Sequence, residues 1–498
     1  MASIKYLITT FINTLNYPDE KIIRKRKLFY FIVVVFILIV NAFWYYYTSK
    51  NNFFVNQKRE ATTGLSYDNA KQFFYFFYYT GYFPLATLND SLDYSLVGAY
   101  NEIKKNGKDL IMEYNHWSRL GENLRIITFY PNAIIKGSPE NPSVKLFNAI
   151  VFVLAQLILF SGFFFNKKGI LGAFIVVVTM FTPYFIYEIY VNQNIFGLLG
   201  STFMITLGLL SSFLFRREKN SLIYIIFSIV ISGILIGLMS EMRGEIIVVA
   251  ASAILIVLFS KERKFLKVIF LLLFIFSLFE TKNRIRTYFD KKFDATYKLV
   301  VKYGGHPYSG KRIKQHRFWH PVFCGLGDFD KKYGYKWNDK VAYNYAIPVL
   351  KEKYGLDLKY SGKYYLDQYY DKDSLYYVKF DEIDEYEEVV KEKVLLDIKN
   401  DPLWYLKILF FRLIRILHVT APFYWLGIPF LIILFIFIKE RQYELLLLLV
   451  SSLPLSLTPF LIYSGGNATL NSFFPEITLG IILCFFSKYF FAKRYIRA

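Results

Sequence analysis

Long apolar runs dominate this chain, and they constrain its fold more than any other feature. Several reach the roughly 18–20 residues that cross a hydrocarbon core about 30 Å thick. Because lipid offers no partners for backbone N–H and C=O groups, such runs predict α-helices. We therefore expect an all-α polytopic membrane protein with about ten spans. The expected spans cover residues 28–47, 145–165, 169–190, 194–215, 221–240, 245–259, 264–279, 423–438, 443–463 and 477–491.

The basic residues predict the orientation of these spans. The formal net charge is +21, but Lys and Arg concentrate in short loops between apolar runs. That pattern is typical of cytoplasmic loops, and it argues against a nucleic-acid partner. A basic cluster at 21–27 directly precedes the first run, and others follow at 167–168, 216–219 and 261–264. We expect both termini to be cytoplasmic, with the first run acting as an uncleaved anchor.

The order of apolar and polar stretches predicts three parts. Residues 1–281 form an N-terminal transmembrane module, which contains a long first external loop at 49–144. Residues 282–401 form a small external α or α+β domain, and 402–498 form an amphipathic helix followed by the last spans. Within the first loop, the aromatic stretch QFFYFFYYTGYFP is too short to cross a membrane. It predicts an interfacial helix.

Acidic and basic residues near the ends of spans are candidates for chemistry. Asp68 precedes the interfacial helix, where the ordinary role of a carboxylate is to cap free N–H groups. Glu188 lies at the end of one expected span, and Arg243 and Glu245 lie between two others. Charges at membrane depth usually face a cavity or a partner. We expect Asp68, Glu188 and Arg243 to gather at the external surface, where they suit a lipid phosphate and a catalytic base.

Residues 401–418 predict a basic amphipathic helix. Lys407, Arg412, Arg415 and His418 fall within about 140° of one helical face, while Leu, Ile, Phe and Trp fill the remainder. We expect this helix to lie in the outer membrane interface. Its arginines either hold a phosphate group in bidentate fashion or anchor the helix on anionic headgroups.

The polar stretch HRFWHPVFCGLGD contains two histidines four residues apart, His316 and His320. Zinc is one interpretation, but the Glu of an HExxH motif is missing and Pro321 limits a helix. Packing of Trp319 with the histidines is a second interpretation, and recognition of a phosphate or sugar by His316, Arg317 and His320 is a third. We expect no cofactor, and a divalent metal is not specifically indicated.

Several neighbouring features of this stretch carry less information. Its GLGD turn lacks the spacing and the lysine of a phosphate-binding P-loop. The aromatic residues of the region are favoured as the core of a small domain over a sugar-stacking surface. Cys324 lies in the polar stretch and Cys484 in a late apolar run, so we expect no disulfide between them.

The first half of the chain resembles the C-type (GT-C) membrane glycosyltransferases. The resemblance covers about residues 20–280 and is carried by YDNAKQFFYFFYYTGYFP in the first loop and SVKLFNAIVFVLAQLIL at the second span. It implies a donor that is a polyprenyl-phosphate sugar, with Asp68 as the catalytic acid and Glu188 as a second acid. Asn69 stands where that family often has another acid.

These features together predict an integral membrane glycosyltransferase of the bacterial inner membrane. It would transfer a sugar on the external face to a glycan, lipid or protein acceptor of the cell envelope. Asp68 would act as general base, and Arg243, Arg412, Arg415 and His418 would hold the lipid-linked donor. An O-antigen-type polymerase or ligase is an alternative. A lipid or polysaccharide transporter is another, although its spans should carry polar residues midway and most spans here are apolar.

Overall fold

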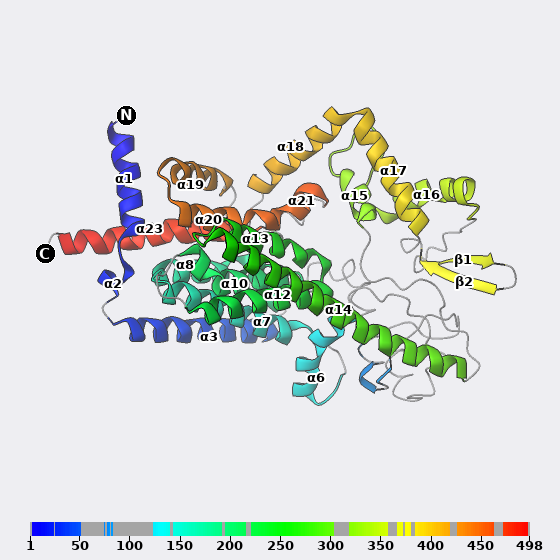
Figure 1. The fold of residues 1–498 in the computed structure, drawn as a ribbon, viewed down its shortest axis with the longest axis horizontal. Coiled ribbons are helices and arrows are strands. Elements are labelled where there is room, and N and C mark those ends of the chain that lie inside the picture. Colours follow the sequence, from blue (N-terminus) through cyan, green and yellow to red (C-terminus); the bar gives the residue numbers. More distant parts are fainter. Residues whose placement is uncertain are drawn as a thin grey trace.

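The chain folds into a helical bundle with a smaller helical unit beyond one end (Figure 1). The computed structural model describes residues 2–23, 25–50, 74, 77–79, 81–82, 123–139, 143–191, 195–215, 221–302, 318–356, 366–371, 374–379, 384–418, 426–462 and 472–496. Most of the predicted interfacial helix and most of the first loop lie outside this part of the chain.

Five helical stretches in the described residues are long and apolar enough to cross a membrane. They are α3 (Arg26–Lys50), α7 (Lys145–Phe165), α12 (Leu222–Met242), the stretch Tyr443–Leu461, and Phe474–Phe491 within α23 (Phe474–Ile496). A sixth results if α8 (Gly169–Phe181) and α9 (Pro183–Tyr190), which meet at 65°, count as one broken span. The chain is therefore an all-α membrane protein, as predicted, but the count of about ten spans is not confirmed.

The other elements of the bundle are shorter. They are α1 (Ala2–Asn16), α2 (Asp19–Ile22), α6 (Tyr130–Lys136), α10 (Leu198–Leu209), α11 (Ser211–Leu214), α13 (Val248–Phe259), α19 (Gly427–Lys439), α20 (Tyr443–Ser451), α21 (Leu457–Leu461) and the 3-10 helices η2 (Asn123–Phe129), η3 (Gly244–Ile247) and η5 (Leu453–Ser456). Three of them, α20, η5 and α21, together make up the stretch Tyr443–Leu461. Glycines allow close helix contacts, because a β-carbon at Gly162 of α7 would lie 2.2 Å from the carbonyl oxygen of Gly208 in α10.

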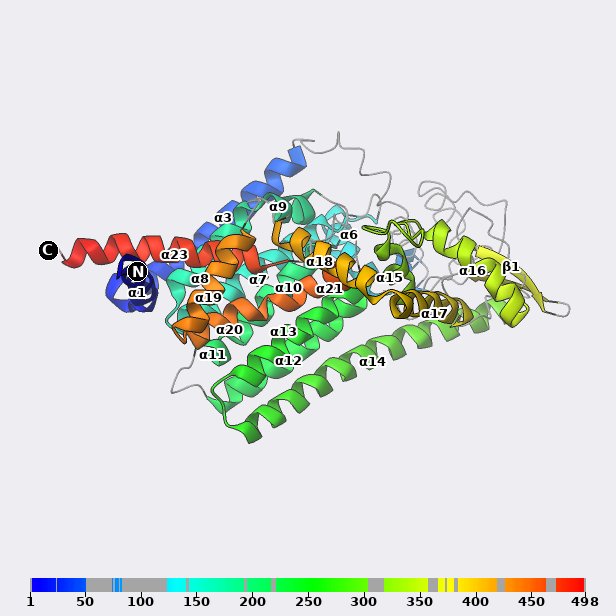
Figure 2. The same ribbon diagram turned by 90° about the horizontal axis from the view of Figure 1, so that it is seen from above.

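One helix, α14 (Lys264–Lys302), runs for 39 residues without a break. At about 1.5 Å per residue it is about 58 Å long, and it extends past the bundle beside α12 (Figure 2). The predicted boundary at 281/282 therefore falls inside a continuous helix. The physical reason is that the charged residues after Phe279 are good helix formers, with no Gly or Pro before Gly304.

The smaller unit has a hydrophobic core of its own, which we call the second core. It is built by α15 (Trp319–Leu326), α16 (Asp339–Tyr354), α17 (Asp384–Asn400) and the first half of α18 (Pro402–His418). The antiparallel strands β1 (Leu366–Asp371) and β2 (Ser374–Lys379) form a hairpin. The buried residues of the second core include Phe323, Leu326, Tyr343, Tyr386, Val390 and Ile408.

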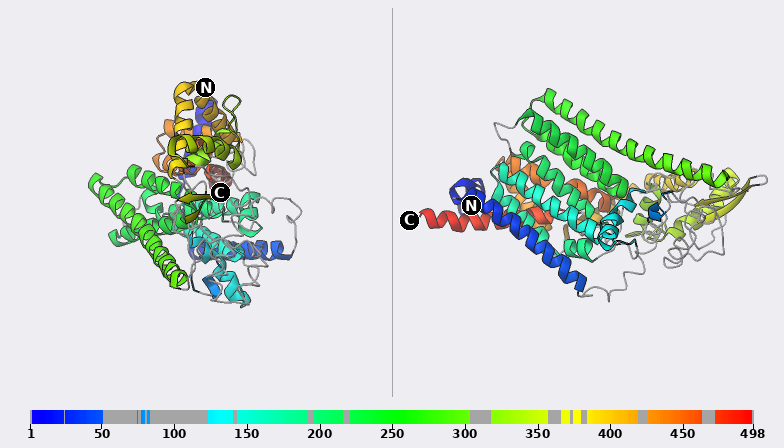
Figure 3. Two further views of the ribbon diagram at one scale, coloured as in Figure 1. Left: turned by 90° about the vertical axis from the view of Figure 1, so that its right-hand side faces the viewer. Right: turned by 90° about the horizontal axis from the view of Figure 1, so that it is seen from below.

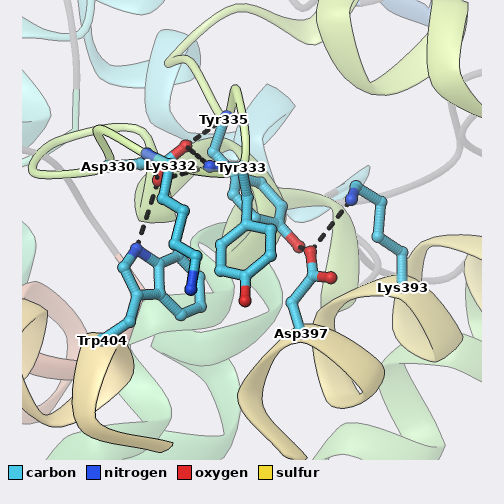
Figure 4. Close-up of polar contacts among 7 residues, drawn as sticks. All are labelled: Asp330, Lys332, Tyr333, Tyr335, Lys393, Asp397 and Trp404. Carbon is cyan, nitrogen blue, oxygen red and sulfur yellow. Dashed lines mark hydrogen bonds and ion pairs between the residues drawn. The ribbon is translucent and has the colours of Figure 1, made fainter. Parts of the chain in front are cut away.

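Polar contacts within the second core fix the turn after α15 (Figure 4). The Asp330 carboxylate accepts hydrogen bonds from the backbone N–H groups of Tyr333 and Tyr335 and from the indole of Trp404. The Tyr335 hydroxyl donates to Asp397 across 2.7 Å, and Lys393 pairs with the same carboxylate oxygen at 2.9 Å. Tyr335 is thus a core residue, as the sequence favours, whereas Trp337 is 47% exposed.

Of the loops that are predicted to be cytoplasmic, those at 167–168 and 261–264 lie at the end of the bundle where both chain termini lie (Figures 1 and 3). Lys488 of α23 forms a buried ion pair with Asp19 at 2.6 Å, and Lys167 lies 3.3 Å from Glu20. Lys261 reaches Glu444 at 3.1 Å. The opposite end of the bundle faces the second core (Figure 1).

Candidate functional site

Helix α18 turns its two arginines toward the protein and leaves much of its apolar face exposed. Arg412 is completely buried, whereas Leu403, Phe410 and Leu413 are 76%, 58% and 45% exposed. Only Lys407 among the expected basic face is exposed. Of the two interpretations of this face, anchoring on membrane headgroups does not fit the burial of Arg412. The reason is that two protein segments already supply acceptors for the arginines, so the apolar face is left outside.

The guanidinium of Arg412 makes fewer hydrogen bonds within the described residues than it has N–H groups to donate. Its Nη1 donates to the carbonyl oxygen of Phe460 in α21 across 3.2 Å. Its Nε and Nη2 atoms are buried without a hydrogen-bond partner among the described residues. Burial lowers the pKa of Arg412 to about 10, so the guanidinium remains charged at neutral pH. A buried, incompletely bonded charge is costly unless an anion compensates it.

The turn after α15 packs against these arginines. Asp328 accepts a hydrogen bond from Arg415 across 2.9 Å, and the Arg415 guanidinium lies 5.0 Å from the ring centre of Phe329. A β-carbon at Gly325 would lie 1.5 Å from the carbonyl oxygen of Ile462 and 3.3 Å from Arg412 Nη2. Only glycine fits there. We call this contact of residues 325–328, at the end of α15, with α18 and α21 the junction.

A second group of charges surrounds Tyr184 at the same end of the bundle, and we call it the bundle-end cluster. Glu188 of α9, Arg243 and Glu245 after α12, and Glu476 in the first turn of α23 all act electrostatically on Tyr184. Arg243 pairs with Glu245 through Nε at 2.9 Å and lies over the ring of Phe196 at 3.8 Å. The predicted gathering of Glu188 and Arg243 is thus present.

The junction and the bundle-end cluster are linked through neighbouring segments. Ser456, which directly precedes α21, contacts Ser472, which lies two residues before α23, with 3.1 Å between the hydroxyl oxygens. Phe460 of α21 bonds Arg412, and Glu476 of α23 belongs to the bundle-end cluster. Buried arginine and buried carboxylates therefore lie on connected segments of one end of the molecule.

The other predicted residues are distributed differently. Asp68, His316 and Arg317 lie outside the described residues. Trp319 is half-buried and packs against the second core, and its backbone N–H donates to Glu387 across 2.8 Å. His418 is half-buried at the end of α18.

His320 points into the second core, away from the junction. Its Nε2 lies 3.2 Å from Asp339 Oδ1 and 3.9 Å from Cys324 Sγ, and its Nδ1 lies 2.5 Å from the hydroxyl of Tyr386. Burial opposes a charge on the ring, but hydrogen bonds to Asp339 and Cys324 outweigh it and raise the pKa of His320 to about 10. The sequence analysis considers His320 together with His316 and does not consider Cys324. Residues four apart on a helix share a face, so the spacing of His320 and Cys324 indicates that they are neighbours.

These arrangements differ in the chemistry they support. The junction offers cationic donors to an anion, and the bundle-end cluster offers carboxylates that can accept a proton. No protein-family model, curated protein or solved structure matches this chain.

Proposed function

We propose that the protein is an integral membrane glycosyltransferase, which transfers a sugar from a polyprenyl-phosphate donor to a glycan, lipid or protein acceptor of the cell envelope. The reaction would take place on the external face of a bacterial inner membrane. The observation that carries this proposal is the buried guanidinium of Arg412, with Nε and Nη2 unpartnered among the described residues.

A phosphate group fits the charge balance of the junction. Asp328 compensates one guanidinium through its ion pair with Arg415, which leaves the charge of Arg412 without a comparable partner in the described residues. Guanidinium groups bind phosphate through two parallel hydrogen bonds, and such bonds are strongest where water is excluded. A bound phosphate would therefore complete the arrangement.

A hydrocarbon chain fits the surface beside that phosphate. Leu406, Phe410 and Ile414 of α18 are 58%, 58% and 46% exposed and follow one another along the helix. Exposure of such an apolar stripe to water is unfavourable, whereas contact with acyl or prenyl chains is not. A ligand with a phosphate at one end and an isoprenoid at the other would contact both faces of α18.

The acid that removes a proton from the acceptor hydroxyl is proposed from two sources. The resemblance to GT-C enzymes implies Asp68. The bundle-end cluster adds Glu188, which is 5% exposed and shares its surroundings with Arg243 and Tyr184. In its ionised form the Glu188 carboxylate could accept the proton of an acceptor hydroxyl.

The proposed topology keeps about ten spans. Five candidate spans and the bent pair α8–α9 make six, and the shorter apolar helices Leu198–Leu209, Gly244–Phe259 and Gly427–Lys439 make nine. The apolar first part of α14 would be the tenth. With both termini cytoplasmic, this arrangement puts the second core outside.

A second candidate is a lipid or polysaccharide transporter, and one observation favours it. The bend of 65° between α8 and α9 divides a span into two half-helices, a feature of many transporters. Buried polar side chains also meet within the bundle, since Gln156 lies 2.7 Å from Asn41 and 3.2 Å from Thr179. A transporter would move the lipid-linked sugar without cleaving the sugar–phosphate bond.

The decisive experiment measures binding of a polyprenyl-phosphate analogue to the purified full-length protein in detergent. We expect Arg412→Lys to weaken binding at least tenfold, which is about 1.4 kcal/mol, because lysine lacks the planar fork. The control is Lys407→Gln, which removes an exposed charge from the same helix. Equal, small and salt-dependent losses for both variants would refute a phosphate site.

A second measurement separates the two candidate functions. Purified protein in vesicles is supplied with a labelled polyprenyl-phosphate sugar and a mixture of cell-envelope acceptors. A glycosyltransferase releases the free lipid phosphate and labels an acceptor, whereas a transporter leaves the donor intact on the other leaflet.

A further inference from the structure

We infer that His320, Cys324 and Asp339 form a binding site for a transition-metal ion of the zinc type. The three side chains offer a ring nitrogen, a thiolate sulfur and a carboxylate oxygen, and these atoms all lie within 4.8 Å of one another. This donor set suits Zn²⁺ and its spectroscopic substitute Co²⁺ better than Mg²⁺ or Ca²⁺, which prefer oxygen ligands.

The separations match a metal site. His320 Nε2 and Asp339 Oδ1 are 3.2 Å apart, and Cys324 Sγ is 3.9 Å from each of them. Zinc bonds of about 2.0–2.3 Å in tetrahedral geometry place ligand atoms about 3.3–3.6 Å apart. A shift of a few tenths of an ångström in the Cys324 side chain would therefore bring all three atoms into the coordination sphere.

Two packed helices hold the three ligands. His320 and Cys324 are four residues apart on α15 and share one helical face. Asp339 is the first residue of α16, whose start is fixed because Asn338 accepts a hydrogen bond from the backbone N–H of Lys340. Both helices belong to the second core, so the ligands sit on rigid elements, as a metal site requires.

The outer contacts of His320 also fit a metal ligand. Its Nδ1 lies 2.5 Å from the Tyr386 hydroxyl, and its ring stacks on Tyr343 with 5.3 Å between centroids. A hydrogen bond at one ring nitrogen orients the imidazole and directs the other nitrogen toward a metal. Here the second nitrogen is the one that faces Cys324 and Asp339.

The site is open on one side. Cys324 is 2% exposed, whereas the Asp339 side chain is 47% exposed. Three protein ligands leave a fourth position for water or for an oxygen atom of a substrate, as in catalytic zinc sites. The ordinary alternative is a core histidine that bonds Asp339, with Cys324 beside it as a small apolar residue. That alternative predicts no metal affinity.

Metal content of the full-length protein tests the inference. The protein in detergent is equilibrated with Zn²⁺ and passed through a desalting column, and bound zinc is counted by mass spectrometry. We expect about one zinc per chain, with loss in Cys324→Ala and in Asp339→Asn. The matched control is Cys484→Ala, which removes the other buried cysteine and should leave zinc binding unchanged.

Cobalt provides a readout that does not depend on how the variants fold. Co²⁺ bound to a thiolate absorbs in the near ultraviolet and, when tetrahedral, in the visible region. The wild-type protein should show both bands, and Tyr386→Phe should weaken metal binding at least tenfold. Absence of a thiolate band in the wild-type protein, or equal zinc in Cys324→Ala and wild type, overturns the site.

Discussion

The guanidinium of Arg415 donates to the carboxylate of Asp328 across 2.9 Å, and this ion pair joins α18 to the turn after α15. Both side chains are largely buried, at 14% and 8% exposure. Arg412 lies one turn earlier on the same helix, and its coulombic neighbours include both Asp328 and Arg415. Asp328 therefore compensates the charge of Arg415 directly, and it favours the charge of Arg412 only through a weaker coulombic interaction.

Removing the charge of Asp328 should destabilise the protein. In Asp328→Asn the two arginines face each other without a compensating carboxylate, and we expect the free energy of unfolding to fall by about 3–5 kcal/mol. Thermal unfolding in detergent measures the change. The control is Lys353→Ala, which breaks the exposed pair with Glu392 and should cost less than about 1 kcal/mol. Similar losses in both variants would contradict a structural role for the Asp328 carboxylate.

Glycine at position 325 should be required for the junction. The backbone of α15 approaches Ile462 so closely that Gly325→Ala must move α15 away from α21. We expect this variant to lose binding of the polyprenyl-phosphate analogue while the bundle stays folded, because the displaced contact lies next to Arg412. Gly244→Ala is the control, since a β-carbon there meets nothing within 4 Å. Unchanged affinity for the analogue in Gly325→Ala would show that donor binding does not require the junction.

Glu188 and Asp68 should differ from an ordinary acidic residue in their effect on transfer. We expect Glu188→Gln or Asp68→Asn to abolish sugar transfer with nearly unchanged donor binding, because each change removes a proton acceptor and keeps the shape. Asn caps a helix as well as Asp does, so a capping role predicts full activity in Asp68→Asn. The exposed Glu352→Gln is the control. Whichever acid retains transfer when neutralised is not the base.

The opposite end of the bundle contains its own buried ion pair. Lys488 and Asp19 are 2% and 5% exposed, and Asp19 also accepts a hydrogen bond from the backbone N–H of Ile170 at 2.9 Å. Lys488→Ala leaves a buried carboxylate unpaired, so we expect a loss of about 3–5 kcal/mol. Lys261→Ala, which breaks a more exposed pair with Glu444, should have a small effect. The thermal unfolding midpoints of the two variants test this prediction, and equal midpoints would contradict it.

The orientation can be tested by labelling. A cysteine at Ser374, in β2, should react with a membrane-impermeant maleimide in intact spheroplasts, whereas one at Lys219 should not. Both native cysteines are buried and should react slowly. The reverse pattern would put the second core in the cytoplasm and exclude an external lipid-phosphate site.

Much of the local structure follows from the sequence alone. The predicted span 145–165 coincides with α7, and the predicted basic helix 401–418 nearly coincides with α18. Apolar runs specify helices wherever they occur, because lipid leaves the backbone no other way to satisfy its hydrogen bonds. Helical periodicity likewise determines that Arg412 and Arg415 share a face. Local chemistry and spacing are sufficient for each of these statements.

What that face contacts was decided by the tertiary structure. Periodicity says that α18 has a basic side and an apolar side, but the inward direction of Arg412 depends on Phe460 and Asp328, which are distant in sequence. The meeting of His320 and Cys324 with Asp339 likewise depends on how α15 packs against α16. The desolvation free energy of a buried charge is offset only when other groups, often distant in the sequence, interact with it. A local sequence pattern does not identify those groups.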